Sequence, residues 1–156
     1  MEENMRINKK KLLSYGIVLS MTAVSMLSTS PLASAAGNVK DEEFSFVSGV
    51  DSYPNYTRWR EKKDTTMTYC YPRKYGGTYA KVSGCYYDKN KDQHLNVQNC
   101  SNGVFIPLNV QGLIVNYVRE YGCNRARLYS YVNKGVATSG LWSPDSTENS
   151  SYTVFK

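Results

Sequence analysis

Residues 66–87 of this 156-residue chain read TMTYCYPRKYGGTYAKVSGCYY. Two runs rich in Thr, Tyr and Val, at 66–72 and 78–87, stand on either side of a Gly-containing segment at 73–77. β-branched and aromatic residues are typical of strands, and a short Gly-rich connection between two such runs is typical of a β-hairpin. The stretch therefore predicts two antiparallel strands joined by a turn.

Similar short runs continue on both sides of this hairpin, separated by Gly, Pro and Asn. They lie at 44–50, 104–110, 113–121, 127–132, 136–142 and 152–155. Many short strands at close spacing, with turn residues between them, are typical of sandwiches and barrels. We therefore predict an all-β fold, a small antiparallel β-sandwich or barrel, in which 88–102 is a long polar connection.

The run at 113–121 has a second interpretation. Four of its residues fall at helical spacing on one face, namely Ile114, Tyr117, Val118 and Tyr121. Its β-branched and aromatic content, and its short length between two glycines, favour a strand. We expect a strand here and keep a short helix as the alternative.

Tyrosine is the dominant aromatic residue, and all 14 tyrosines except Tyr15 lie beyond residue 36. Strand alternation places Met67, Tyr69 and Tyr71 on one face of their strand and Cys70 on the other. These rings either fill the core or form an exposed binding platform. We favour the core, because the chain has few other large apolar residues with which to fill one.

The N-terminus has the three zones of a secretory signal peptide. A basic stretch that includes Arg6 and Lys9 precedes an apolar run at 12–27, and small residues at 28–36 follow, with Ala33-Ser34-Ala35 as a cleavage-like triplet. We expect 1–36 to be a cleaved signal peptide, 37–43 a flexible lead and 44–156 a single secreted domain. A second apolar segment of spanning length is not found, so stable membrane insertion is not expected.

The four cysteines, Cys70, Cys85, Cys100 and Cys123, all lie in the exported part. An even number in a small exported domain predicts two disulfides, and the spacing lacks the paired ligands of a zinc site. The hairpin puts Cys70 and Cys85 too far apart for a bridge. Two pairings remain open: Cys85 to Cys100 with Cys70 to Cys123, which we prefer, and Cys70 to Cys100 with Cys85 to Cys123.

Catalytic and metal-binding chemistry find little support. The chain has one histidine, His94, which lies in a polar loop where a solvated role is the usual one. Residues 88–92 begin like a calcium loop, but Gln93 stands where the turn glycine is needed and Asn99 where the glutamate ligand belongs. We therefore expect neither an enzyme nor a protein with a metal or another cofactor.

Cations stand close to aromatic residues in several places, although the formal net charge is only +6. We take Arg58, Trp59, Arg60, Arg73 and Tyr75 as the candidate binding surface, and note a further trio in Arg119, Arg125 and Arg127. Such pairs suit an anionic cell-envelope polymer or a sugar, through cation, stacking and hydrogen-bond contacts. Because the domain is expected outside the cell, nucleic acid is not an expected partner; ordinary solubilising charge is the alternative reading.

Three segments, 58–71, 124–129 and 139–146, together resemble a group of small secreted Gram-positive proteins of unknown function. The distinctive part is the ending at 140–146, Gly-Leu-Trp-Ser-Pro-Asp-Ser. The resemblance implies a signal peptide and one compact β domain, and it brings no catalytic residues. Physically, Trp142 suits the end of a strand anchored in the core, and Ser143-Pro144-Asp145 suits a turn.

The chain is also loosely similar to lactococcin-type bacteriocins, which are exported β-sandwich domains. Two functional hypotheses follow from these observations. The first is a non-enzymatic binding or interaction module at the cell envelope, and the alternative is a secreted antibacterial toxin.

Overall fold

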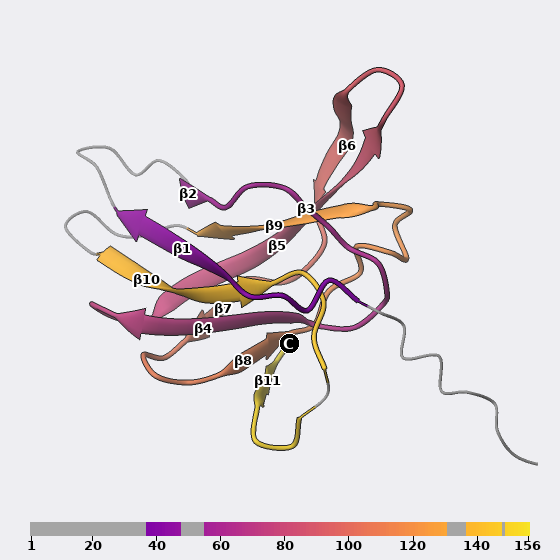
Figure 1. The fold of residues 1–156 in the computed structure, drawn as a ribbon. Helices are drawn as coiled ribbons and strands as arrows, with labels where there is room; N and C mark the ends of the chain where they lie inside the picture. The colour runs from indigo at the N-terminus through magenta and orange to yellow at the C-terminus, as the bar shows by residue number, and fades with distance from the viewer. Residues whose placement is uncertain (1–36, 48–54, 131–136, 148) are drawn as a thin grey trace, which may run out of the picture. The chain divides into compact units, whose positions relative to one another are not determined.

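The computed structural model describes residues 37–47, 55–130, 137–147 and 149–156. These residues form β-strands and turns without any helix, which confirms the prediction of an all-β fold (Figure 1). The predicted signal peptide, 1–36, lies outside the described residues.

The first sheet has five strands. In spatial order they are β1 (Glu42–Val47), β10 (Ala137–Ser143), β4 (Thr68–Lys74), β8 (Gly112–Ile114) and β11 (Thr153–Phe155). Neighbouring strands run antiparallel, except that β11 runs parallel to β8. The sheet is therefore mixed, whereas the sequence predicted purely antiparallel pairing.

The second sheet has six strands. Four follow one another as β2 (Asn55–Tyr56), β9 (Arg125–Ser130), β5 (Thr78–Asp88) and β6 (Gln93–Asn99), while β3 (Arg60–Glu61) also pairs with β9 and β7 (Val104–Ile106) also pairs with β5. All of these pairs are antiparallel. Because β9 and β5 are the central strands, they are covered by pairing on both edges.

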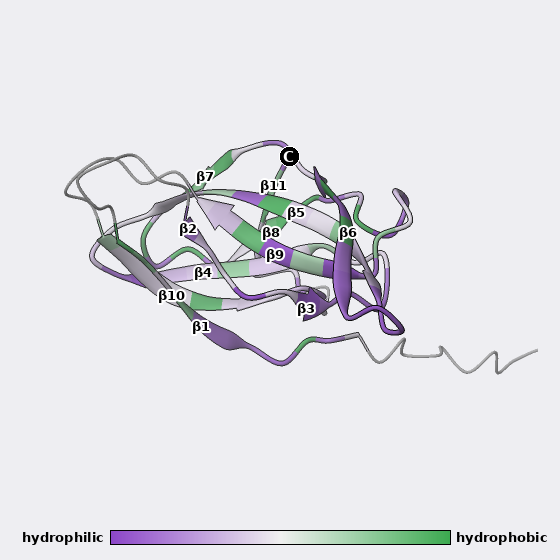
Figure 2. Cartoon of the chain, turned by 90° about the horizontal axis from the view of Figure 1, so that it is seen from above, coloured by the Kyte–Doolittle hydropathy of each residue, from purple (hydrophilic) through white to green (hydrophobic). Residues whose placement is uncertain are grey.

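One apolar core joins the two sheets. Its large side chains come from both of them: Phe44, Phe46, Ile114 and Trp142 from the first, and Val82, Ile106 and Leu128 from the second. Figure 2 shows hydrophobic segments on β5, β9 and β10, and a largely hydrophilic β6. Tyrosines contribute little to this core, so our preference for a tyrosine-filled core was wrong. Tyr69 is buried on the outer face of its sheet instead, where its ring lies 5.3 Å from that of Tyr152.

The predicted hairpin is wrong, although both of its strands exist. β4 pairs with β10 and β8 in the first sheet, whereas β5 pairs with β9, β6 and β7 in the second. The intervening turn, where Tyr75 has a φ of 71°, therefore carries the chain from one sheet to the other. A Gly-rich turn indicates that the chain changes direction. It does not show which strands will pair with each other. The sequence analysis excluded a disulfide between Cys70 and Cys85 because of their separation in this hairpin. Since the hairpin is not formed, that argument no longer holds.

The polar segment 88–102 contains a strand that the sequence analysis missed. β6 pairs with the end of β5, and the turn between them includes Asp92 with a φ of 51°. Asp88 Oδ1 accepts a hydrogen bond from the backbone N–H of Asn90, so an oxygen of the calcium-like stretch serves the turn. Because nearly every side chain of β6 is exposed, its sequence lacks the apolar alternation that would have revealed it.

The run at 113–121 is a strand only at its beginning, in β8. Beyond Ile114 the chain turns, with Tyr121 N–H donating to the carbonyl of Tyr117 and Cys123 N–H to that of Val118. The helical spacing of this run therefore reflects a local turn, and neither the full strand nor the helix is formed.

A buried ion pair connects the ends of the two sheets. Lys62 follows β3 and Asp145 follows β10; Nζ of Lys62 lies 2.7 Å from Oδ1 of Asp145, and both side chains are fully buried. The second carboxylate oxygen accepts hydrogen bonds from the backbone N–H groups of Asn38 and Lys63. The pair thus connects three segments in one hydrogen-bonded network: the residues after β3, the residues after β10, and the N-terminal lead at 37–43.

The lead 37–43 is held against the domain, which differs from the flexible segment that we expected. β1 begins at Glu42, two residues before the predicted boundary. The guanidinium of Arg60 donates to the side chain of Asn38 and to the carbonyl of Lys40. The domain therefore includes the lead from Asn38 onward.

Gly140 sits at a bulge between β10 and β4, where an added methyl group has no space. A Cβ there would lie 2.0 Å from the carbonyl oxygen of Tyr71, a backbone atom that cannot move aside. We predict that Gly140→Ala destabilises the domain by about 1–3 kcal/mol or more, measured by chemical denaturation. Gly76→Ala is the control, because the nearest atom there is 3.8 Å away. An unfolding free energy of Gly140→Ala within about 0.5 kcal/mol of wild type would contradict the packing described here.

Candidate functional site

The outer face of the second sheet carries cations and aromatic rings instead of apolar residues. Strand alternation turns Ala126 and Leu128 of β9 toward the core, and Arg125, Arg127 and Tyr129 to the other side. The segment 57–62 runs along the edge of β9, where the backbone N–H of Thr57 donates to the carbonyl of Leu128 and that of Lys62 to the carbonyl of Asn124.

Seven side chains on this face contact one another in a continuous series, which we call the aromatic–cation ladder. In order of contact it runs through Tyr129, Tyr56, Arg127, Trp59, His94, Tyr87 and Arg125. The members come from β2, β5, β6, β9 and the loop before β3, so the ladder exists only in the folded chain.

The first half of the ladder is built around one guanidinium group. The rings of Tyr129 and Tyr56 stack with their centroids 5.1 Å apart. Arg127 lies over the rings of both Tyr56 and Trp59, with its guanidinium carbon 3.8 and 4.3 Å from their centroids. Trp59 stacks in turn on His94, at 5.5 Å and an interplanar angle of 19°. Cation–π contacts of this kind hold the guanidinium plane and leave its edge to donate hydrogen bonds.

The second half of the ladder runs from His94 of β6 through Tyr87 of β5 to Arg125 of β9. The ring of Tyr87 lies 5.0 Å from that of His94, and the guanidinium of Arg125 lies 4.8 Å from Tyr87. The hydroxyl of Tyr87 donates to Asp92, which raises the pKa of Tyr87. His94 is exposed to solvent, as we expected, and its ring also contacts those of Trp59 and Tyr87.

Arg127 is held by aromatic rings and forms no ion pair among the described residues. Its Nε atom is buried and lacks a hydrogen-bond partner among the described residues, and no described Asp or Glu forms an ion pair with Arg125 or Arg127. Burial lowers the pKa of Arg127, although a guanidinium remains charged at any physiological pH. Positive charge that is held by aromatic rings and forms no ion pair among the described residues can accept an anionic group from outside.

A hollow of about 330 Å³ opens beside Trp59 and Arg125. The other residues around it are Asn38, Lys40, Glu42, Arg58, Arg60 and Glu61. A ligand lying along the ladder could therefore place a substituent in this hollow.

Two arginines of the predicted surface have different roles. Arg58 is exposed and pairs with Glu42, 2.5 Å between Nη2 and Oε1, and this hydrogen bond lowers the pKa of Glu42. Arg60 is only 6% exposed; it donates to the carbonyl of Trp142 and lies over the tryptophan ring. Arg60 is therefore a structural residue, and its assignment to the binding surface is corrected.

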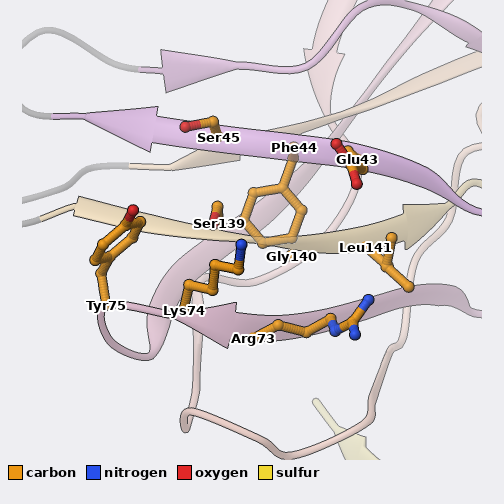
Figure 3. Close-up of a pocket in the computed structure, with 9 residues that line it drawn as sticks. All are labelled: Glu43, Phe44, Ser45, Arg73, Lys74, Tyr75, Ser139, Gly140 and Leu141. Carbon is orange, nitrogen blue, oxygen red and sulfur yellow. The ribbon is translucent and has the colours of Figure 1, made fainter.

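Arg73 and Tyr75 lie on the other sheet. They line a hollow of about 600 Å³ on the outer face of the first sheet, in which Arg73 and Lys74 stand on one side of β10 and Glu43 and Ser45 on the other (Figure 3). Tyr75 is 79% exposed. The five predicted residues therefore do not form one surface: Trp59 belongs to the ladder and Arg58 to the hollow next to it, whereas Arg73 and Tyr75 line a separate hollow with charges of both signs.

The sequence pointed to three members of the ladder and missed the other four. Trp59 was in the candidate surface, and Arg125 and Arg127 were noted as further cations near aromatic residues, but the sequence does not show that they contact one another. Tyr129, Tyr56, Tyr87 and His94 were not assigned to a binding surface. Only the pairing of β9 with β2, and of β5 with β6, brings them together.

The four cysteines are buried free thiols in this structure. Cys85, Cys100 and Cys123 are near enough to influence one another electrostatically. Cys100 and Cys123 approach Gly84 from the core, where an added Cβ would lie 2.7 and 3.1 Å from their sulfur atoms. Burial, with a contribution from Cys123, raises the pKa of Cys85 to about 11 and that of Cys100 to about 12. Cys70 lies on β4 in the other sheet, and burial alone raises its pKa. Thiols with such pKa values are poor nucleophiles at neutral pH.

Neither metal-ligand clusters nor membrane-spanning helices are found in the described part of the chain. No group of three or more His, Cys, Asp or Glu side chains is placed there to hold a metal ion. No helix there is long and apolar enough to cross a membrane.

The comparisons with known proteins give one match. The model of a family described as "Protein of unknown function (DUF2712)" matches residues 32–146. The comparisons with curated proteins and with solved structures found no match.

The contrast between Arg58 and Arg60 gives a test of this geometry. We predict that Arg60→Ala lowers the unfolding free energy by about 3 kcal/mol or more, because it leaves the carbonyls of Trp142 and Lys40 without their donor and removes a buried guanidinium from Glu42. Arg58→Ala, at an exposed ion pair two residues away, should leave it almost unchanged, because solvent screens the pair. Denaturant unfolding of the two variants measures both values. If both variants lost the same unfolding free energy, the result would contradict the structure, in which Arg60 is buried and Arg58 is exposed.

Proposed function

The chain belongs to the DUF2712 family, a family of unknown function, and we propose that its β domain is a non-enzymatic binding module for anionic glycopolymers of the bacterial cell envelope. The observation that carries this proposal is the aromatic–cation ladder. It offers stacking surfaces and unpaired guanidinium groups within one face of one sheet.

Sugar rings and anionic groups need different partners, and the ladder supplies both. The apolar faces of sugars pack on aromatic rings, as Trp59 and Tyr56 would allow. Phosphate or carboxylate oxygens accept paired hydrogen bonds from guanidinium groups, as Arg125 and Arg127 would allow. A polymer that repeats sugar and anion along its length would engage both kinds of group at once.

The cell envelope follows from the expected export of the chain. The signal-peptide pattern of 1–36 supports a secreted product, and a secreted protein meets wall polymers before it meets nucleic acid. Stacking rings beside cations would also suit single-stranded nucleic acid, so the choice between the two ligands rests on the compartment.

A binding role also suits the chemistry of the ladder better than catalysis does. Its polar groups are two guanidiniums, one imidazole and phenol hydroxyls, which bind anions and sugars. Nucleophilic catalysis would need an activated nucleophile within reach of a base, and the buried thiols of the neighbouring cluster have raised pKa values.

We propose in addition that export oxidises cysteines of the domain. The proximity of Cys85, Cys100 and Cys123 supports one bridge within this cluster. A second bridge would require Cys70, which lies in the other sheet, to reach across the core. A disulfide in the cluster would lie directly beneath the ladder strands β5 and β9 and would stabilise them.

Binding to purified Gram-positive cell walls tests the function. We predict that the mature protein sediments with walls at low salt and is released as salt rises, because exposed charge contacts are screened within about 8 Å at physiological ionic strength. Arg127→Gln should weaken binding roughly tenfold, which corresponds to one lost charge-assisted hydrogen bond. Arg73→Gln, in the hollow of the other sheet, is the matched control and should bind as wild type does.

The ligand class is read from the same assay with walls stripped of their phosphate polymers. Retained binding to stripped walls would indicate a neutral glycan instead of an anionic one. The proposal fails if the unmodified protein does not bind intact walls at low salt, or if Arg73→Gln weakens binding as much as Arg127→Gln does. Melting temperatures of both variants confirm that each is folded.

A further inference from the structure

Three titratable side chains meet in the interior, away from the ladder, and the binding role does not use them. They are Lys62, Asp64 and Asp145. The side chains of Lys62 and Asp145 are fully buried, and that of Asp64 is 13% exposed. Asp145 belongs to the Trp-Ser-Pro-Asp-Ser stretch, the most distinctive part of the sequence, and it is the residue of that stretch that contacts Lys62.

The amine and the carboxyl group are within reaction distance of each other. Nζ of Lys62 lies 2.7 Å from Oδ1 of Asp145, and the same nitrogen also donates to the carbonyl of Thr66. Because both partners are held without exposure to solvent, their effective concentration is far above that of free groups in water. Water that would compete as a nucleophile is excluded from the contact.

The other carboxylate oxygen has the environment of an oxyanion hole. Oδ2 of Asp145 accepts the backbone N–H of Asn38 at 2.6 Å and that of Lys63 at 3.0 Å. Two backbone donors aimed at one oxygen stabilise the negative charge that develops there when a nucleophile attacks the carbonyl carbon.

Asp64 provides a carboxylate within reach of both partners. Its Oδ1 lies 3.8 Å from Nζ of Lys62 and accepts hydrogen bonds from Thr66, which fix its position. A Cβ placed on Gly37 would lie 2.5 Å from Oδ2 of Asp64 and 2.9 Å from Cβ of Asp145, so the two acidic side chains flank the same point of the lead. Asp64 is therefore placed to accept a proton from one partner and return it to the other.

We propose that Lys62 and Asp145 react with each other to form an intramolecular isopeptide bond between Nζ and Cγ. The ammonium and the carboxylate together contain all the atoms of the amide and of one water molecule, so the reaction needs neither an oxidant nor a co-reactant. The bond would join two residues 83 positions apart in the chain.

Lys62 Nζ transfers one proton to Oδ1 of Asp145, and the neutral amine attacks Cγ while the electron pair moves to Oδ2. Asp64 accepts a second proton from the nitrogen and passes it to Oδ1. The bond between Cγ and Oδ1 breaks, water leaves, and the carbonyl re-forms at Oδ2.

The surroundings of Asp145 oppose the first proton transfer. Burial raises the pKa of Asp145, but the hydrogen bonds from Lys62, Lys63 and Asn38 outweigh it, so the pKa is lowered overall. A carboxylate with a lowered pKa is a weak proton acceptor, so we expect the bond to form slowly, after the protein has folded.

Intact mass spectrometry of the reduced, denatured mature protein tests the proposal. We expect the mass to lie about 18 Da below that of the sequence beginning at Ala36 or Gly37, which is the loss of one water molecule in amide formation by a lysine amine. A protease digest should contain one branched peptide that joins Lys62 to Asp145. The experiment does not involve the ladder, so it stands or falls separately from the binding function.

Variants separate this bond from other losses of mass. Lys62→Met should restore the full mass, whereas Lys63→Met, an exposed neighbour with the same change, should keep the deficit. Asp64→Asn retains both reacting groups and should leave most of the protein without the bond, even if Lys62→Met does not fold. Full mass in the wild-type protein, or a deficit that persists in Lys62→Met, would overturn the proposal.

Discussion

The buried contact between Lys62 and Asp145 is the constraint on which the position of the ladder depends. Two charges removed from water are costly unless each finds enough partners, and Asp145 finds them in one ammonium and two backbone N–H groups. These partners belong to the lead, to the segment after β3 and to the end of β10. Because Lys62 lies three residues after Trp59, the contact also fixes the loop that carries the tryptophan across the second sheet.

The second sheet can then devote its outer face to polar and aromatic contacts. Its inner face completes the core with Val82, Leu128 and Ile106, so the stability of the domain does not require Arg127 or Trp59 to pack inside. Arg60 also lies against an aromatic ring, that of Trp142, but it has a structural role. Its guanidinium is surrounded by carbonyl acceptors and Glu42. The difference between the two arginines is the presence or absence of acceptors within the fold.

The sequence predicted the all-β class and the positions of most long strands, because alternation and Gly-rich turns are local signals. It did not predict partners: the stretch at 66–87 reads as a hairpin, and only competition among all strands sends β4 and β5 to different sheets. β6 was not predicted, because a strand with both faces exposed shows little alternation of apolar and polar residues. Trp59, Arg125 and Arg127 were noted from the sequence, whereas Tyr56, Tyr87 and His94 join them only through strand pairing. The buried role of Asp145 is equally invisible, since a turn motif does not show that its carboxylate points inward.

The two tryptophans provide the most direct test of the ladder as the binding surface. Trp59 belongs to the ladder, and Trp142 is 1% exposed in the core, so their indole N–H signals in a ¹⁵N NMR titration report on the two places separately. The probe is a soluble wall glycopolymer that carries phosphate groups, added to the mature protein at low salt. The account predicts that the Trp59 signal shifts as the polymer binds while the Trp142 signal stays in place. Saturable binding that leaves the Trp59 signal unmoved would contradict it.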